Sequence, residues 1–366
     1  SVRVGGGEPT EVEVARGEAR VDILRESIFI DALQAGVRVG DGIAAVQLRD
    51  LLLPWARGTG TVAVGMGTGE ARVDIALALE DVVADSLQWV SREIPPLRGS
   101  SRLTGQIRGA ESRWTLAEAG LDWRGGDVRG GGTLVLSPGG GRLAGVDARV
   151  AGLPVDALDR WLPEPARVGG RVGGRLRLDG ALSRLEVGSE LTWTTPLGQP
   201  VVARGTGGLV GVGSPDLGFD DFSLTLAPFD WAALRRSAGI PVPLDGPGFL
   251  AADLSGALDS GIRIAAVARH LGREEGLDPS LVRVEGSVTS AAGRGLGLDL
   301  AADFAPLDLG VLRLPVDSGP APVLPIDNPV DGTVRITGDT RALELDGEVE
   351  DGSGRASFTA LLEPSD

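Results

Sequence analysis

The sequence predicts an all-β fold, an elongated repeat array of antiparallel strands that forms a curved sheet. Three observations lead to this prediction. Apolar residues alternate with polar or small ones, as at Val73, Ile75 and Leu77, which is typical of a strand with one apolar face. The 57 glycines include Asp-Gly pairs such as Asp179-Gly180 that favour tight turns. A sequence motif recurs about every 70 to 80 residues, and it consists of a short amphipathic segment, a Pro-containing stretch and strands separated by glycines.

The repeat is most visible at three tryptophans in the amphipathic segments. Trp89, Trp161 and Trp231 are about 70 residues apart, and a fourth copy at 307–312 has no Trp. A unit of this size with one apolar face cannot bury that face alone, so neighbouring copies should share a core. The repeats predict five segments, which are a partial repeat at 1–84, repeats at 85–155, 156–227 and 228–304, and a partial repeat at 305–366.

The strands are expected in chain order between these connecting segments. Alternation predicts them at 66–80, 131–136, 174–179, 221–227, 295–304, 332–337 and 342–350. Aromatic residues make up only 4% of the chain and Tyr is absent. We therefore expect a gutter-like sheet whose interior is aliphatic, built from Leu, Val, Ile and Ala.

Short helical connectors are expected between groups of strands. Residues 156–162 and 230–237 are amphipathic but too short for a helix to be stable alone, so they should pack across an end of the sheet. The Trp side chains of these connectors should occupy equivalent positions. Residues 266–281, which include His270, predict a loop insertion with a turn of helix inside the 228–304 repeat.

Composition and motifs argue against an enzyme. The chain has no Cys, and its only histidine, His270, is interpreted as a solvated loop residue without a neighbouring nucleophile. The glycine-rich run 169–174 lacks the Lys-Ser/Thr of a phosphate-binding loop. The formal net charge of −16 argues against binding a nucleic-acid backbone. We expect no catalytic residue, no metal, no cofactor and no nucleic-acid partner.

The aliphatic face is the remaining candidate site, and the sequence leaves two interpretations of it open. It is either the buried core of a closed β-repeat or an open groove that holds acyl chains. In the second case the groove should be lined, on one continuous concave face, by Ile75, Leu77, Leu134, Leu136, Leu176, Leu178, Leu224, Leu226, Leu298, Leu300, Val334 and Ile336.

The repeated motif, a connecting segment followed by strands, resembles the repeats of the AsmA-like/TamB superfamily of bacterial envelope proteins. The segment 153–161, followed by the glycine-punctuated strand 170–180 and by 185–191, is the best match, and 227–234 is the next. The resemblance implies a β-taco in the Gram-negative periplasm, anchored to the inner membrane through a segment that this sequence does not contain.

The same resemblance implies the function and the partners. A non-enzymatic hydrophobic conduit would carry phospholipids between the inner and outer membranes, with acyl chains in the groove and an outer-membrane barrel protein as partner of the full-length parent. Two alternatives stay open at this stage. One is a chaperone-like factor that assembles outer-membrane proteins by strand pairing; the other is a structural or adhesive β-repeat with a closed core. A carbohydrate-active array is disfavoured because Tyr is absent.

Overall fold

The computed structural model is all-β, with antiparallel strands in a sheet that does not close into a barrel. It describes residues 10–23, 26–40, 42–53, 56–65, 72–83, 98–123, 125–155, 169–211, 218–231, 246–257, 260–270, 280–291, 295–307, 313–314, 321–322, 329–339 and 342–362. No helical element occurs in these ranges, and so none that is long and apolar enough to span a membrane.

The chain divides into two compact units. Unit 1 holds residues 1–161 and 175–181, and unit 2 holds residues 162–174 and 182–366. The strands of unit 1 are β1 (Thr10–Ile23), β2 (Glu26–Gly40), β3 (Ile43–Leu53), β4 (Ala56–Gly65), β5 (Arg72–Val83), β6 (Arg98–Arg108), β7 (Glu111–Trp123), β8 (Gly126–Ser137), β9 (Gly140–Pro154) and most of β10 (Arg171–Ala181). Those of unit 2 are β11 (Arg184–Thr194), β12 (Pro200–Val210), β13 (Gly218–Asp230), β14 (Pro247–Ala257), β15 (Ile262–His270), β16 (Ser280–Ala291), β17 (Gly295–Leu307), β18 (Arg313–Leu314), β19 (Ala321–Pro322), β20 (Val330–Asp339), β21 (Ala342–Asp351) and β22 (Gly354–Leu362).

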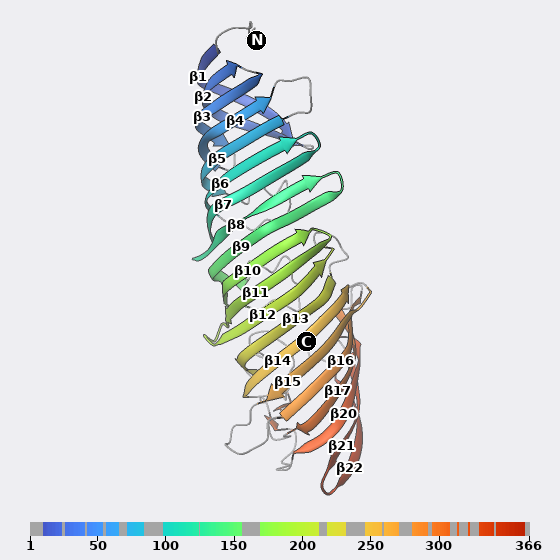
Figure 1. Ribbon diagram of the computed structural model, residues 1–366. Helices are drawn as coiled ribbons and strands as arrows, with labels where there is room; N and C mark the ends of the chain where they lie inside the picture. Colours follow the sequence, from blue (N-terminus) through green and yellow to red (C-terminus); the bar gives the residue numbers. More distant parts are fainter. Residues whose placement is uncertain are drawn as a thin grey trace. The chain divides into compact units, whose positions relative to one another are not determined.

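Strand order follows chain order in each unit (Figure 1). In unit 1, strands β1 to β9 pair antiparallel with their neighbours in sequence, and β10 pairs with β9. In unit 2, the same pairing runs from β11 to β17 and continues through β20, β21 and β22. The short strands β18 and β19 pair only with each other. All connections inside the main sheet are therefore between adjacent antiparallel strands.

From β6 to β17, strands are grouped in fours along the chain, as β6–β9, β10–β13 and β14–β17. Strand β5 and the last strands of these groups, β9, β13 and β17, end at Val83, Pro154, Asp230 and Leu307, and each is followed by a long connection before the next strand. Three of these strands carry a β-bulge near their end, between Leu79 and Val82, Leu226 and Phe229, and Phe304 and Leu307. Because a bulge bends its strand and increases the local twist, these positions curve the sheet.

The long connections leave from the same edge of the sheet within each unit. We call this edge, at the ends of β5 and β9 in unit 1 and of β13 and β17 in unit 2, the connector rim. The opposite edge has tighter connections, such as 109–110 between β6 and β7 in unit 1 and 340–341 between β20 and β21 in unit 2, and we call it the turn rim.

Buried side chains gather near the connector rim. In unit 2 the main core cluster consists of Val201, Phe229, Trp231, Ala268, Phe304, Leu307 and Val330. In unit 1 two smaller clusters consist of Ala35, Leu48 and Leu51, and of Ala56, Leu79 and Val82. Most of these residues lie at the ends or bulges of strands, where connections reach the sheet.

The strands expected from alternation are present. The seven expected segments correspond to β5, β8, β10, β13, β17, β20 and β21, except that residues 66–71 lie outside the described ranges. Most of the expected helical connectors also lie outside them, at 84–97, 156–168 and 232–245, as do Trp89 and Trp161. The equivalence of the three tryptophans therefore stays a prediction.

One local prediction is wrong. Residues 266–270, expected to begin a loop insertion with a turn of helix, are the end of β15, and His270 is paired with Ser280 in the sheet. His270 is only 2% exposed, so it is not a solvated loop residue. The error arose because alanines occupy the apolar positions of this strand and give a weak alternating pattern beside the charged residues 269–275.

Candidate functional site

One face of unit 2 is built from rows of uncharged side chains that cross the sheet. Residues directly opposite each other in an antiparallel pair share a face, so the strand registers define these rows. One row contains Leu254, Ile264, Gly286, Leu300, Ile336, Leu345 and Ala360, from β14 to β22. The next contains Leu224, Ala252, Ala266, Val284, Ala302, Val334, Gly347 and Phe358, from β13 to β22. We call this the apolar face of unit 2.

Unit 1 has an apolar face of the same kind. One of its rows contains Val37, Val46, Val62, Ile75, Gly105, Trp114, Leu134 and Leu143, from β2 to β9. The next contains Ala35, Leu48, Gly60, Leu77, Leu103, Leu116 and Gly132. Neither row contains a charged residue, so hydrocarbon lying across these strands would meet no ionised group.

The registers place the twelve expected groove residues on these two faces. Unit 1 carries Ile75, Leu77, Leu134 and Leu136 on its apolar face. Leu176 and Leu178 alternate along β10 with Arg175 and Arg177, which pair with Asp147 on the other face, so they too belong to the apolar face of unit 1. Unit 2 carries Leu224, Leu226, Leu298, Leu300, Val334 and Ile336 on its apolar face. Contact of any of them with lipid stays a prediction.

The apolar faces are only partly buried. Ile75, Leu134, Leu300 and Ile336 are half-buried, whereas the core of a closed sandwich would bury such side chains almost completely. No described side chain is less than 2% exposed. An uncovered sheet face explains this pattern.

Exposure also differs between the two rims. In unit 1, Val64 and Leu136 near the turn rim are 37% and 40% exposed, while Leu79 near the connector rim is 4% exposed. The apolar face of unit 1 is thus closed toward the connector rim and open toward the turn rim.

Glycines on the apolar faces make room for large side chains on the next strand. A Cβ atom built at Gly105 would lie 2.5 Å from Cζ3 of Trp114, and one at Gly205 would lie 2.8 Å from Cζ of Phe222. The indole of Trp114 is held in place by a hydrogen bond from Nε1 to Oγ of Ser112, at 3.1 Å. These aromatic–glycine pairs keep the apolar surface continuous where the sheet curves.

The opposite face of each unit is polar and carries cross-strand ion pairs. In unit 1, Nη2 of Arg108 lies 2.5 Å from Oδ1 of Asp74, and Nε of Arg175 donates to Oδ1 of Asp147 at 2.7 Å. The hydrogen bond from Arg108 is the main cause that lowers the pKa of the Asp74 carboxyl from its usual 3.8. The Arg175 hydrogen bond lowers the pKa of Asp147 in the same way.

Trp231 is the one connector tryptophan within the described residues. It is 4% exposed, packs edge-on against Phe229 with ring centroids 4.6 Å apart, and its backbone N–H donates to the carbonyl of Gly246 at 2.8 Å. The ring lies against Gly248, where an added Cβ would be 2.3 Å from Nε1. Trp231 therefore closes the core of unit 2 at the connector rim.

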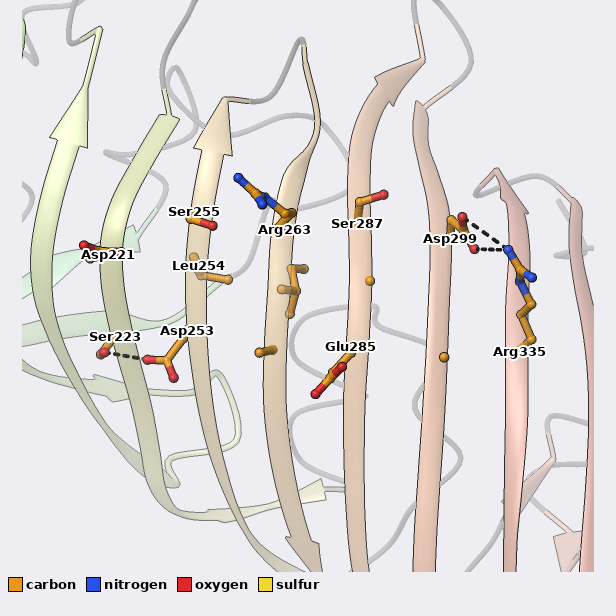
Figure 2. Close-up of a pocket in the computed structure, with 14 residues that line it drawn as sticks. Asp221, Ser223, Asp253, Leu254, Ser255, Arg263, Glu285, Ser287, Asp299 and Arg335 are labelled. Carbon is orange, nitrogen blue, oxygen red and sulfur yellow. Dashed lines mark hydrogen bonds and ion pairs between the residues drawn. The ribbon is translucent and has the colours of Figure 1, made fainter.

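A concave feature lies on the polar face of unit 2 and was not expected from the sequence. It is a cavity of about 960 Å³ across β13 to β20 (Figure 2). Its polar lining comes from residues that alternate with the apolar rows. The sequence indicates such a polar face but not which of its residues become neighbours, because that depends on strand register.

The described residues include no group of three or more His, Asp or Glu side chains placed to hold a metal ion. Comparisons with models of protein families, with curated proteins and with solved structures find no match for this chain. The resemblance of the repeat motifs to the AsmA-like/TamB superfamily therefore stays a prediction, and the apolar faces are the candidate site on which a function can be argued.

Proposed function

We propose that the apolar faces hold phospholipid acyl chains and that the chain is a non-enzymatic segment of a hydrophobic conduit in the Gram-negative periplasm. The observation that carries the proposal is the set of half-buried rows without charge that cross many neighbouring strands in each unit. Large contiguous apolar surfaces are costly to expose to water and mark sites that bind hydrophobic ligands or partners.

Acyl chains fit this surface better than a compact ligand does. The faces are long, almost purely aliphatic and open along the turn rim of unit 1, where Val64 and Leu136 are exposed. Transfer of each methylene from water to such a surface gives about 0.8 kcal/mol when burial is complete. Because neighbouring rows are chemically alike, a chain that slides from one row to the next exchanges similar contacts, so no large barrier is expected.

The repeat motifs support the cellular part of the proposal. By similarity to the AsmA-like/TamB superfamily, the conduit would join the inner and outer membranes. Headgroups would stay in water at the open rim while acyl chains lie on the apolar face.

A charge placed in the middle of an apolar row tests the proposal. Leu300 of β17 lies between Gly286 and Ile336 in its row, and it is half-buried outside the main core cluster. The change Leu300→Asp should leave the protein folded but reduce bound lipid strongly, because acyl chains would have to desolvate the carboxylate. Lipid extracted with organic solvent is quantified by mass spectrometry, and contacts are mapped by photo-cross-linking to a lipid with a reactive acyl chain.

The matched control is Thr359→Asp, which adds the same charge on the exposed polar face of β22, next to Ala360 of the same apolar row and outside the cavity of unit 2. It should leave bound lipid at the level of the unmodified protein. Circular-dichroism melting of both variants separates loss of binding from loss of structure. Unfolding of Leu300→Asp would favour a closed core, and a folded Leu300→Asp variant with unchanged lipid would remove the conduit proposal.

A further inference from the structure

Strand β22 has one backbone edge that no described residue covers. Within the residues that the structure describes, β22 pairs with β21 alone (Figure 1). Asp351 and Gly354 are directly paired across a turn of two residues, and in such a hairpin the closing pair shares its hydrogen bonds. Hydrogen bonding alternates along an antiparallel pair, so the backbone N–H and C=O groups that point away from β21 are those of Arg355, Ser357, Thr359 and Leu361.

This edge lacks the features that usually prevent an edge strand from pairing. Charged side chains, Pro and β-bulges have that effect in natural sheets. Strand β22 has no bulge and no Pro, and Arg355 is the only charged residue among its nine. By contrast, β1 has charged residues at positions 11, 13, 16, 18, 20 and 22, and its pairing with β2 has two register shifts. Strand β22 is therefore suited to accept a further strand, and β1 is not.

Large apolar side chains are exposed on both sides of β22. Phe358 is on the apolar face and 39% exposed, although its ring lies over Gly347 of β21. Leu361 is on the polar face and 57% exposed, the largest exposed fraction of any large hydrophobic residue in the described ranges. A strand paired with the open edge would cover part of both side chains.

The open edge is complementary to a second copy of itself. Full-length antiparallel pairing of β22 with β22 of another copy places Phe358 opposite Phe358, with Cβ atoms about 5 Å apart. In the same register Ser357 is opposite Thr359 of the other copy, and Arg355 is opposite Leu361. These are the residues whose backbone groups point outward, so each pair can exchange hydrogen bonds. No two like charges meet, and the methylene groups of Arg355 can cover Leu361.

From this arrangement we infer that two copies of the chain associate through β22, about a two-fold axis that passes between the two Phe358 residues. Such an axis is perpendicular to the sheet and keeps both apolar faces on the same side. The row that contains Leu345 and Ala360 then continues into Ala356 and Val349 of the other copy. A single pair of strands is a small interface, so the association is weak and depends on protein concentration.

Sedimentation equilibrium over about 1 to 100 μM protein tests the inference, and a monomer–dimer equilibrium is expected in that range. Ser357→Pro removes an outward N–H beside the axis and leaves every hydrogen bond to β21 in place. It should weaken the dimer about tenfold or more, the loss of one hydrogen bond from each copy. The control Ser357→Ala keeps the N–H group and should not change the equilibrium. Circular-dichroism melting shows whether both variants are folded.

Single cysteines determine the register, since the chain contains none of its own. Ala356→Cys, Phe358→Cys and Ala360→Cys each place one thiol on the same face of β22. Under mild oxidation Phe358→Cys should form a disulfide dimer about tenfold faster than the other two, because only this thiol faces its own copy within bonding distance.

Three results would overturn the inference. The first is a monomer at all concentrations, or a folded Ser357→Pro variant that dimerises as well as Ser357→Ala does. The second is cross-linking of Phe358→Cys no faster than that of the two neighbouring variants. The third is a series of species larger than a dimer, which would mean that β22 pairs with β1 of the next copy. All three are independent of bound lipid, so the acyl-chain proposal would be unaffected.

Discussion

Gly105 and Trp114 show how single residues shape the apolar face. They are directly paired on β6 and β7, and the indole lies over the glycine because no Cβ atom is in the way. Phe304 lies over Gly332 and Phe358 over Gly347 in the same manner in unit 2. These pairs place large rings on faces that are otherwise aliphatic, and each depends on a glycine that is otherwise unfavourable in a strand.

Gly105→Ala should therefore destabilise the protein. The new methyl group would meet the Trp114 ring at 2.5 Å, and the ring is fixed by its hydrogen bond to Ser112. Overpacking of this kind costs about 1–3 kcal/mol, measurable by urea unfolding. Gly120→Ala is the control, because nothing lies within 4 Å of a Cβ atom at that position. Equal stabilities of the two variants would show that Trp114 moves freely.

The face on which a residue lies could be predicted where apolar and polar residues alternate strongly along the strand. It could not be predicted where this alternation is weak. Leu298 and Leu300 lie on the apolar face as their spacing indicates. His270 was misjudged because its neighbours are small or charged, yet it is buried beside Ser280 at the connector rim. Burial at a strand end depends on which connection covers it, and a single sequence does not specify that contact.

Two features shape the strands: β-bulges bend them, and cross-strand ion pairs hold neighbouring strands together. The bulge of β5 contains Asp81, whose φ of 51° is in the left-handed region, and that of β13 after Phe219 contains Asp221, with φ of 46°. Both shift the register by one residue and bend the strand. The ion pairs between described residues, such as Asp74–Arg108 and Asp299–Arg335, lie on the polar face, so they order neighbouring strands without interrupting the apolar rows.

The ion pair between Asp147 and Arg175 should make stability depend on pH in acid. Because the folded-state pKa of Asp147 is lowered by Arg175, the pair stabilises the fold above the usual value of 3.8 and the effect is lost as the pH falls through the lower folded pKa. Arg175→Gln should lower the melting temperature slightly at neutral pH, and the difference should vanish in acid. The effect is small since both side chains are partly exposed, at 43% and 42%.

Arg113→Gln serves as the control for that experiment. Arg113 is on the polar face of β7 and has no ion-pair partner among the described residues. Its removal should change the melting temperature equally at all pH values. A pH-independent effect of Arg175→Gln would contradict the assigned role of the pair.

Strand positions could be predicted from alternation, whereas registers and bulges could not. A bulge adds one residue to a strand, as between Leu79 and Val82. Two consecutive polar residues in an alternating sequence are compatible with a bulge and with a regular strand, so the sequence does not determine which of the two forms. The cavity of unit 2 depends on such registers, because Arg263 and Ser287 meet only through the pairing of β15 with β16. The cavity of unit 2 therefore could not be predicted from the sequence.

At the scale of the whole molecule, the chain repeats one design in both units, a sheet with one uncharged face and one charged face. Alternation was enough to predict the fold class and the composition of the apolar face. It did not decide whether a second layer covers that face, because a closed core and an open face have the same pattern of residues. The half-buried side chains of the described residues favour the open face.

Single cysteines can test this openness, since the chain contains none of its own. Val64→Cys and Leu136→Cys in unit 1 should react with a maleimide nearly as fast as Ile43→Cys, which is on the polar face and 49% exposed in the unmodified protein. Leu79→Cys, at a position only 4% exposed, should react much more slowly. Protection of Val64→Cys to the level of Leu79→Cys would mean that the apolar face is covered.

The grouping of strands in fours has a consequence for how such a chain can change in length. Reversal of direction at every antiparallel turn means that an even number of strands returns the backbone to its starting edge. Loss or duplication of one whole group, for example β14 to β17, would therefore keep every later side chain on its own face and every long connection on its own rim. An odd number would exchange the two rims for all that follows. Parity thus lets the chain length vary in steps of one group while the chemistry of both faces is preserved.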